Sequence, residues 1–239
     1  MTTINDILAM ASHRPYAMPQ GKWAYYQEWN RAVFLHWQIP EAVLRPLVPE
    51  RLSIDTYAGQ AYVSLVAFTM EQIRPRNLPA VGLISCFDEI NLRTYIGNDD
   101  KKGVYFLNIE GGKLLSCMVA RGLSGLPYEK SDIIRSPGRY RSRNSAKNFR
   151  LDLSYATRGD IIRKTELDRW LTERYCLYLD KGRKLYRYEI HHAEWALKDA
   201  ELRNIDVDYR LGGLQLTGSP DMTHYSDGVK VMAWQRVEL

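Results

Sequence analysis

The sequence predicts a mostly antiparallel α+β fold, in which a curved sheet or closed barrel carries a few peripheral helices. Strand-like runs rich in β-branched and aromatic residues recur along the chain, and turn-forming clusters such as Asn98-Asp99-Asp100 and Gly111-Gly112 separate them. Helical patterns occur in only three places. The regular alternation of strand and helix that builds a parallel sheet is missing from the pattern, which favours antiparallel pairing.

The expected strands follow one another at short intervals. A hairpin is expected at 52–57 and 61–68, turning at Ala58-Gly59, and a proline-rich loop at 74–79 follows it. The remaining strands are expected at 31–38, 87–96, 104–109, 139–143, 149–155, 185–192, 207–216 and 229–237.

Each expected helix has its own signal. Pro40 followed by Glu41 is typical of a helix start, and Pro49 limits that helix to a few residues. Residues 113–123 carry apolar side chains at helical spacing. Thr165 is a suitable N-cap for a helix that runs to about residue 174, because acidic residues follow it in the first turn.

Length and composition indicate one globular domain. The chain has 239 residues, of which 45% are hydrophobic and 26% charged, and it contains no repeat or low-complexity tract. No apolar run approaches the roughly 20 residues that cross a bilayer, so no membrane association is expected. The N-terminus lacks the features of a signal peptide, and we therefore expect a cytoplasmic protein.

Metal and cofactor signatures are weak. Cys86, Cys117 and Cys176 are far apart and form no CxxC pair, and the adjacent His191 and His192 would point to opposite faces of a strand. The sequence also lacks GxGxxG, GxxxxGK[ST], HExxH and GxSxG. We therefore expect no metal site and no cofactor.

Much of the net charge of +5 comes from one stretch, in which six basic residues and no acid lie between residues 133 and 151. Arg139, Arg141 and Arg143 alternate with Tyr140 and Ser142, which is typical of a strand rather than a flexible basic arm. Three interpretations are open: a solvated face, a surface for a polyanion, or arginines that enter a ligand cavity. No signature of a nucleic-acid-binding fold accompanies the stretch, so we expect no specific nucleic-acid partner.

Longer segments carry a family resemblance. The run AVFLHWQIPEAVLRPLVPERLSIDTYAGQAYVSLVAFTM, followed by IRPRNLP, FDEINLRTY and HHAEWAL, resembles the YqjF-like family of uncharacterised bacterial proteins. That family is similar in fold to acetoacetate decarboxylase, so the resemblance implies a barrel around an interior pocket. It assigns residues 23–239 to one decarboxylase-like domain and leaves residues 1–22 as an N-terminal extension.

The resemblance also suggests residues for a site. NRAVF at 30–34 and LRPLVPERLSID at 44–55 are similar to a decarboxylase segment that begins with an active-site Arg, which places Arg31 there; CFDE at 86–89 places Glu89 on an active-site Glu. We expect both side chains in one cavity, where the arginine would hold a carboxylate or carbonyl ligand and the glutamate would handle a proton. The alternative is an internal salt bridge with a structural role.

The Schiff-base lysine of the decarboxylase has no counterpart in the similar segment ARGLSGLPYEK. Tyr128 and Glu129 occupy the two lysine positions. Lys130 lies one residue further on, and on an extended segment a shift of one residue points the side chain to the opposite face. Imine-forming decarboxylation, which requires such a lysine, is therefore not expected.

Further candidates lie on the strand expected at 87–96. Its alternation places Arg93 and Tyr95 on the same face as Glu89 and Asn91, in a polar stripe that faces either solvent or a polar cavity. The expected ligand site therefore comprises Arg31, Glu89, Arg93 and Tyr128. On a neighbouring strand, His36 is expected to pack in the core rather than to act as a base.

Two functions remain as hypotheses. The first is an interior pocket that binds or transforms a small carboxylate or carbonyl compound. The second is a non-enzymatic scaffold, its pocket filled by side chains, that acts by associating with another protein. The sequence leaves catalytic residues and the oligomeric state, including a homo-oligomer, open.

Overall fold

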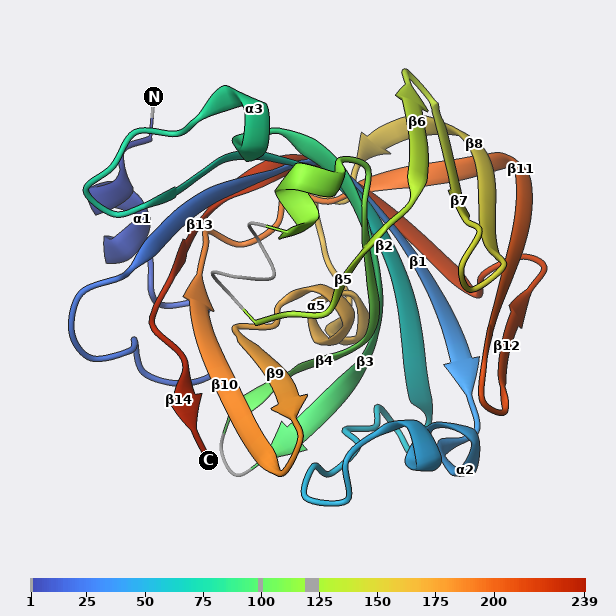
Figure 1. Cartoon of the computed structure of the whole chain (residues 1–239), viewed down its shortest axis with the longest axis horizontal. Coiled ribbons are helices and arrows are strands. Elements are labelled where there is room, and N and C mark those ends of the chain that lie inside the picture. Colours follow the sequence, from blue (N-terminus) through green and yellow to red (C-terminus); the bar gives the residue numbers. More distant parts are fainter. Residues whose placement is uncertain (1, 99–100, 119–124) are drawn as a thin grey trace.

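The computed structural model describes residues 2–98, 101–118 and 125–239 (Figure 1). The helices are α1 (Ile4–Ala9), α2 (Glu41–Leu44), α3 (Gly82–Ser85) and α5 (Glu166–Thr172), with a 3₁₀ turn at Arg45–Leu47 and helical residues at 114–118. The strands are β1 (Tyr25–Ile39), β2 (Ala61–Pro75), β3 (Phe87–Asn98), β4 (Lys101–Gly111), β5 (Tyr128–Lys130), β6 (Asp132–Ser136), β7 (Arg139–Asn144), β8 (Phe149–Asp160), β9 (Cys176–Lys181), β10 (Lys184–His191), β11 (Lys198–Leu211), β12 (Leu214–Thr217), β13 (Met222–Ala233) and β14 (Val237–Glu238).

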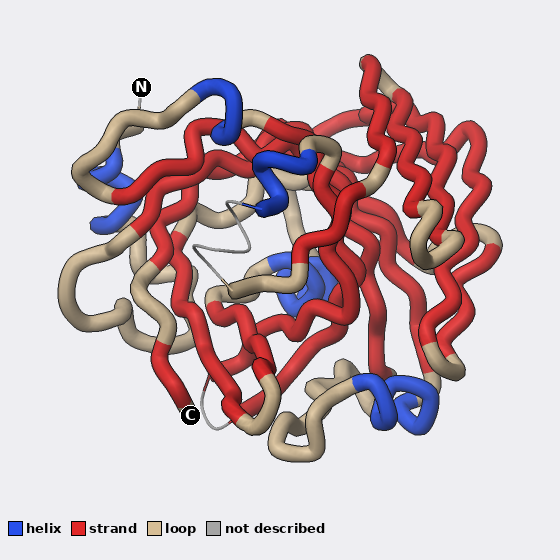
Figure 2. The backbone as a smooth tube through the Cα atoms, in the orientation of Figure 1, coloured by secondary structure: helices blue, strands red, loops and turns tan. Residues whose placement is uncertain are grey.

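The long strands close into a ring. Neighbouring strands pair in the order β10, β9, β4, β3, β2, β1 and β13, and β10 also pairs with β13. Most pairs are antiparallel, and β4 runs parallel to β9 and to β5. Strands dominate the fold and the helices are few and short, which Figure 2 shows in red and blue. The mostly antiparallel, curved or barrel-like fold expected from the sequence is confirmed.

A second group of strands, β6, β7, β8, β11 and β12, extends from one side of the ring. Two apolar cores result from this arrangement. One core fills the ring and includes Phe34, Val66 and Phe87. The other includes Val33, Leu65 and residues of β7, β8, β11 and β12. Successive residues of β1 and β2 thus serve opposite cores, as the two-residue period of a strand requires.

Helix α5 lies inside the ring (Figure 1) and forms the floor beneath its interior. Thr165 caps the helix as expected, because its hydroxyl accepts from the Asp168 N–H while the Asp168 carboxylate accepts from the Thr165 N–H. Leu171 is fully buried, and Trp170 packs against the Tyr95 ring at 4.5 Å between ring centroids. The helix is therefore fixed both by its cap and by its apolar contacts.

Several local expectations need correction. Residues 52–57 form no strand and contribute only isolated bridges at Ile54 and Tyr57. Strand β2 runs through to Pro75, where a loop was expected, because its backbone still pairs with β1 there. The segment 207–216 is the end of one strand, a turn at Gly212 and the start of another, since Gly212 has a φ of 56°. The helix expected at 113–123 is helical at 114–118, and its remainder at 119–123 lies outside the described residues.

Strand β9 and the short strands β5, β6 and β14 were not predicted. Within the segment 1–22, which was expected as an N-terminal extension, Ile7 packs on the ring, where it is buried with Trp23, Tyr26 and Trp234. Within the part of the chain that the structure describes, no helix is long and apolar enough to span a bilayer.

Candidate ligand cavity

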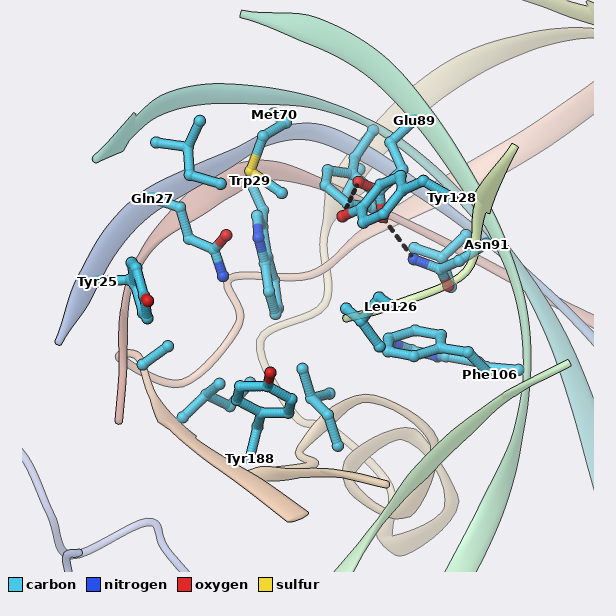
Figure 3. A pocket seen from close by; sticks show the side chains of 18 of the residues that line it. Tyr25, Gln27, Trp29, Met70, Glu89, Asn91, Phe106, Leu126, Tyr128 and Tyr188 are labelled. Atoms are coloured by element: carbon cyan, nitrogen blue, oxygen red, sulfur yellow. Dashed lines mark hydrogen bonds between the residues drawn. The ribbon is translucent and has the colours of Figure 1, made fainter. Parts of the chain in front are cut away.

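A cavity of about 100 Å³ lies inside the ring of strands. Space of this size admits several water molecules or one small organic molecule. Its walls are mainly aromatic and aliphatic side chains from β1, β2, β3, β4, β9 and β10 (Figure 3). Among the described lining residues, Glu89 and Arg93 are the side chains that carry a formal charge, and both lie on β3. The cavity is thus an apolar space with a polar group on one wall.

The polar group comes from alternate residues of one strand. Glu89, Asn91 and Arg93 point inward from β3, as the alternation predicted, and all three are buried. Tyr128 on β5 reaches the same place, and Figure 3 shows its ring beside Glu89 and Asn91. The polar stripe of the sequence therefore faces the cavity rather than solvent.

Glu89 is held in an environment that favours its neutral form. Burial raises the pKa of this carboxyl from its ordinary value of 4.5 to about 7, against the opposing effect of two hydrogen bonds. The Tyr128 hydroxyl donates to Oε2 at 2.9 Å, and the Asn91 amide lies 3.4 Å from Oε1. Near neutral pH this carboxyl can therefore either donate or accept a proton.

Arg93 is a buried cation without a carboxylate partner among the described residues. Burial lowers the pKa of its guanidinium, and Tyr95 opposes that effect whereas Arg174 adds to it. Its Nε has no hydrogen-bond partner, and the guanidinium lies over the Phe34 ring at 5.8 Å. Because arginine stays protonated in proteins, the cavity carries an uncompensated positive charge.

Other cavity residues also leave polar atoms unused. Trp29 Nε1 is a buried donor without a partner, and Asn91 Oδ1 is a buried acceptor without one. Buried polar groups in native proteins nearly always have partners, so such atoms on the wall of one cavity indicate where a ligand or ordered water binds.

Arg31 lies elsewhere, so the expectation that it shares a cavity with Glu89 is wrong. The pairing of β1 with β2 is interrupted between Asn30 and Val33, and Arg31 has a φ of 54° at this bulge. Before the bulge Trp29 faces the cavity and after it Ala32 does, which leaves Arg31 on the outside. There it lines an outer groove, pairs with Glu71 at 2.8 Å, and keeps 48% of its side chain exposed.

The side chains of the three residues around the expected lysine position lie in different surroundings. Tyr128 faces the cavity, whereas Glu129 forms an ion pair with Lys147 at 2.9 Å. Lys130 pairs with the exposed Asp132 at 2.9 Å and does not line the cavity. Its orientation away from the cavity agrees with the one-residue shift argued from the sequence.

The basic stretch forms a solvated face. Arg139, Arg141 and Arg143 are exposed on β7 while the residues between them are buried. Arg139 and Arg141 approach the Asp152 carboxylate at 3.0 and 3.5 Å, and the exposed Arg150 pairs with an aspartate of β11. Arg139, Arg141 and Arg150 thus have acidic partners on neighbouring strands, and neither they nor Arg143 line the cavity.

Sequence reasoning missed much of the cavity wall. Trp29, Phe106 and Tyr188 line it, yet none belongs to a motif. The available signal near Trp29 was the two-residue alternation of Tyr25, Gln27 and Trp29, which all line the cavity. His36 is fully buried and hydrogen-bonded, in agreement with its expected place in the core. Within the described residues no cluster of three or more His, Cys, Asp or Glu side chains is placed to hold a metal ion.

Solved structures of similar fold include acetoacetate decarboxylases and a biosynthetic enzyme. The enduracididine biosynthesis enzyme MppR complexed with pyruvate matches with a TM-score of 0.62 at 10% identity, covering 93% of this chain and 92% of MppR. An acetoacetate decarboxylase matches with a TM-score of 0.62 at 15% identity, covering 92% and 90%. The acetoacetate decarboxylase-like enzyme from Sphingomonas wittichii RW1 has a TM-score of 0.58 at 14% identity, covering 95% and 98%. At such identities the likeness establishes the fold.

Sequence similarity is stronger within one family. The uncharacterized protein YqjF of Bacillus subtilis (strain 168) is 34% identical over 226 residues, which cover 91% of this chain and 93% of YqjF. The family DUF2071, described as an uncharacterized conserved protein, matches residues 26–230. These matches span the ring of strands and the cavity wall on β3, and the chain therefore belongs to the DUF2071 family, with the YqjF-like character and decarboxylase-like fold that its sequence suggested.

Proposed function

We propose that this protein binds a small monocarboxylate in the interior cavity, with the carboxylate at Arg93 and a short apolar substituent against the aromatic wall. The observation that carries the proposal is the buried guanidinium without a carboxylate partner among the described residues. A bound anion would balance this charge and would occupy donors that are otherwise unused. Because the cavity offers one unpaired cation, we expect a ligand with one negative charge. Binding of dicarboxylates and phosphates, which carry more charge, is expected to be weaker.

Glu89 extends the proposal from binding to chemistry. In its protonated form it donates to a ligand carbonyl or carboxylate oxygen, and in its ionised form it repels an anion. A carboxyl that titrates near pH 7 inside the cavity is suited to move a proton to or from a carbonyl compound. This supports a ligand that carries a carbonyl group beside its carboxylate.

Imine formation is not part of the proposed function. Among the described residues that line the cavity none is a lysine, and Tyr128 stands where the resemblance places the catalytic amine. Treatment with borohydride and acetoacetate is expected to leave the protein mass unchanged. A reduced adduct that maps to Lys130 would contradict this expectation.

The binding proposal is tested with three probes of similar size. Butyrate carries one charge and an apolar tail, butyramide has nearly the same shape without charge, and succinate carries two charges. Titration calorimetry is expected to detect butyrate binding that exceeds butyramide binding by at least about tenfold, with succinate weaker than butyrate. Equal affinity for butyrate and butyramide would refute the proposal.

Mass spectrometry of the natively purified protein provides an independent route to the natural ligand. A retained monocarboxylate that is released on denaturation would support the cavity assignment. The competing hypothesis is a scaffold whose pocket is filled by side chains. The open cavity beside Arg93 and the unpartnered Nε of that arginine do not support it. Failure of all small carboxylates to bind would favour it.

A further inference from the structure

A chain of buried polar side chains crosses the interior beside the cavity. The Tyr95 hydroxyl lies 2.6 Å from Ser64 Oγ, which lies 2.6 Å from His36 Nδ1. His36 Nε2 lies 3.2 Å from His224 Nδ1, and His224 Nε2 lies 2.9 Å from Asp168 Oδ1. The five residues come from β3, β2, β1, β13 and α5, and each is less than 6% exposed. This polar chain connects the floor helix to the strand that bears Arg93.

The Asp168 end of the polar chain has a fixed polarity. The Thr165 backbone N–H, which can only donate, lies 2.7 Å from Asp168 Oδ2 in the cap of α5. Burial alone would raise the pKa of Asp168, but hydrogen bonds from Thr165 and His224 outweigh it and lower the pKa. Asp168 is therefore a carboxylate, and it accepts a hydrogen bond from His224 Nε2.

This polarity passes along the polar chain because each neutral imidazole has one donor and one acceptor. Burial lowers the pKa of both His224 and His36, so both rings are neutral. His224 donates from Nε2 to Asp168 and must accept at Nδ1, so His36 donates from Nε2 and accepts at Nδ1. Ser64 then donates to His36, and its remaining lone pairs accept from Tyr95.

The far end of the polar chain lies next to the cavity cation. Tyr95 and Arg93 are two residues apart on the same face of β3, and Tyr95 stabilises the charged guanidinium. In this arrangement the single Tyr95 hydroxyl proton is directed to Ser64 Oγ at 2.6 Å, and the Leu171 carbonyl lies further away, at 3.1 Å. The lone pairs of the tyrosine oxygen are therefore available to accept from Arg93, and a hydrogen bond between the two side chains helps to keep the guanidinium charged.

We propose that the negative charge of Asp168 fixes the direction of every hydrogen bond in the polar chain, and that Asp168 and His224 thereby position Arg93 for anion binding. The positioning role rests on the proposed function, whereas the direction of the hydrogen bonds stands without it. Asp168 and His224 also line an outer pocket beside α5, so the polar chain links a surface feature to the interior cation.

The substitution Asp168→Asn reverses the polar chain in this account. The Thr165 N–H requires the amide oxygen at the Oδ2 position, which turns the amide NH₂ towards His224 Nε2. His224 must then accept at Nε2 and donate from Nδ1. For the same reason His36 accepts at Nε2 and donates from Nδ1. Ser64 donates to Tyr95 instead of His36, which occupies a lone pair of the tyrosine oxygen that Arg93 would use.

Long-range ¹H–¹⁵N correlation of the imidazole rings tests the direction, and the chain has only five histidines. In the wild-type protein we expect His36 and His224 as neutral rings protonated at Nε2. His192 is an internal control of opposite pattern, because its Nδ1 faces the Ala193 carbonyl at 2.7 Å and must be protonated. In Asp168→Asn we expect His36 and His224 to switch to Nδ1 protonation while His192 is unchanged.

Wild-type rings protonated at Nδ1, or charged, would overturn the proposal even if the variant failed to fold. A folded Asp168→Asn protein with both rings still protonated at Nε2 would also overturn it.

Butyrate binding tests the positioning role. Asp168→Asn is expected to weaken butyrate about fivefold, within the range seen for residues that act on a site through a network. Asp199→Asn is the matched control, because Asp199 lines the same outer pocket without joining the polar chain. Unchanged affinity in Asp168→Asn after a demonstrated tautomer switch would refute the positioning role. Absence of butyrate binding in the wild type would refute the proposed function and leave the tautomer result valid.

Discussion

The cavity and the outer groove each combine an arginine with a glutamate, yet the two pairs differ in charge. In the outer groove Arg31 and Glu71 lie 2.8 Å apart and are partly solvated, and each holds the other in its charged form. In the cavity Arg93 has no carboxylate partner among the described residues, and burial raises the pKa of Glu89. The charge of Arg31 is therefore balanced by a neighbouring side chain, whereas the charge of Arg93 requires something else to balance it.

The contrast shows how burial changes the role of the same residue types. A solvated ion pair contributes at most about 1 kcal/mol, since water screens both charges. A buried cation without a partner is costly to the fold, and proteins retain such groups mainly where they bind something. The cavity, rather than the groove, is therefore the candidate site.

The largest stability effect is expected from Glu89→Gln. Between pH 4.5 and about 7 the folded protein holds a proton on Glu89 that the unfolded chain has released, so the wild type loses stability as pH rises. The full loss is roughly 3 kcal/mol. Denaturant unfolding at pH 5 and pH 8 should therefore show Glu89→Gln gaining stability relative to wild type at the higher pH.

Glu71→Gln is the matched substitution in the outer groove. Its partner Arg31 helps to lower the pKa of Glu71, so the stability from that pair is present above the ordinary glutamate pKa and is lost on acidification below it. Between pH 5 and pH 8 the difference from wild type should stay constant to within about 0.5 kcal/mol. Equal pH dependence in the two variants would remove the distinction between cavity and groove.

Tyr128→Phe removes a donor from the buried carboxyl and should cost about 1–3 kcal/mol at pH 8. The same change at Tyr155 in the outer groove, where the hydroxyl lies 3.5 Å from Arg135, should cost no more than about 0.5 kcal/mol. Urea unfolding of both variants provides the comparison. A similar cost at the two positions would mean that the Tyr128–Glu89 contact is no stronger than a surface contact.

A small effect is also expected on the solvated face of β7. Replacing Arg139 and Arg141 by serine should change the free energy of unfolding by less than about 1 kcal/mol, because both contact one partly exposed Asp152. Neither the wild type nor the variant should bind random-sequence DNA or RNA tightly at physiological salt. A submicromolar dissociation constant that is lost in the variant would show a nucleic-acid surface instead.

The strand pattern predicted the inward stripe of β3 correctly because Glu89, Asn91 and Arg93 follow an uninterrupted alternation. Arg31 was misplaced for the opposite reason. A bulge changes which face each later residue takes, and an arginine with positive φ has no sequence signature comparable to glycine.

Contacts between residues far apart in the chain could not be predicted from the sequence either. The polar chain from Tyr95 to Asp168 joins five elements, so no local pattern brings its members together. The N-cap at Thr165 was predicted because it is local, but its consequence for His224, which lies 56 residues beyond Asp168, required the closed ring.

Calorimetric titration of Arg93→Gln and Arg31→Gln with butyrate decides whether the buried arginine of the cavity binds the anion. Arg93→Gln should weaken butyrate binding by at least about 30-fold, since the anion loses its buried partner. The unliganded Arg93→Gln protein should be no less stable than wild type, because an uncompensated charge is removed. Arg31→Gln should leave the affinity within about twofold of wild type, because Glu71 neutralises that arginine in the outer groove. Butyrate affinity that survives in Arg93→Gln and falls in Arg31→Gln would contradict the account and place the anion site in the outer groove.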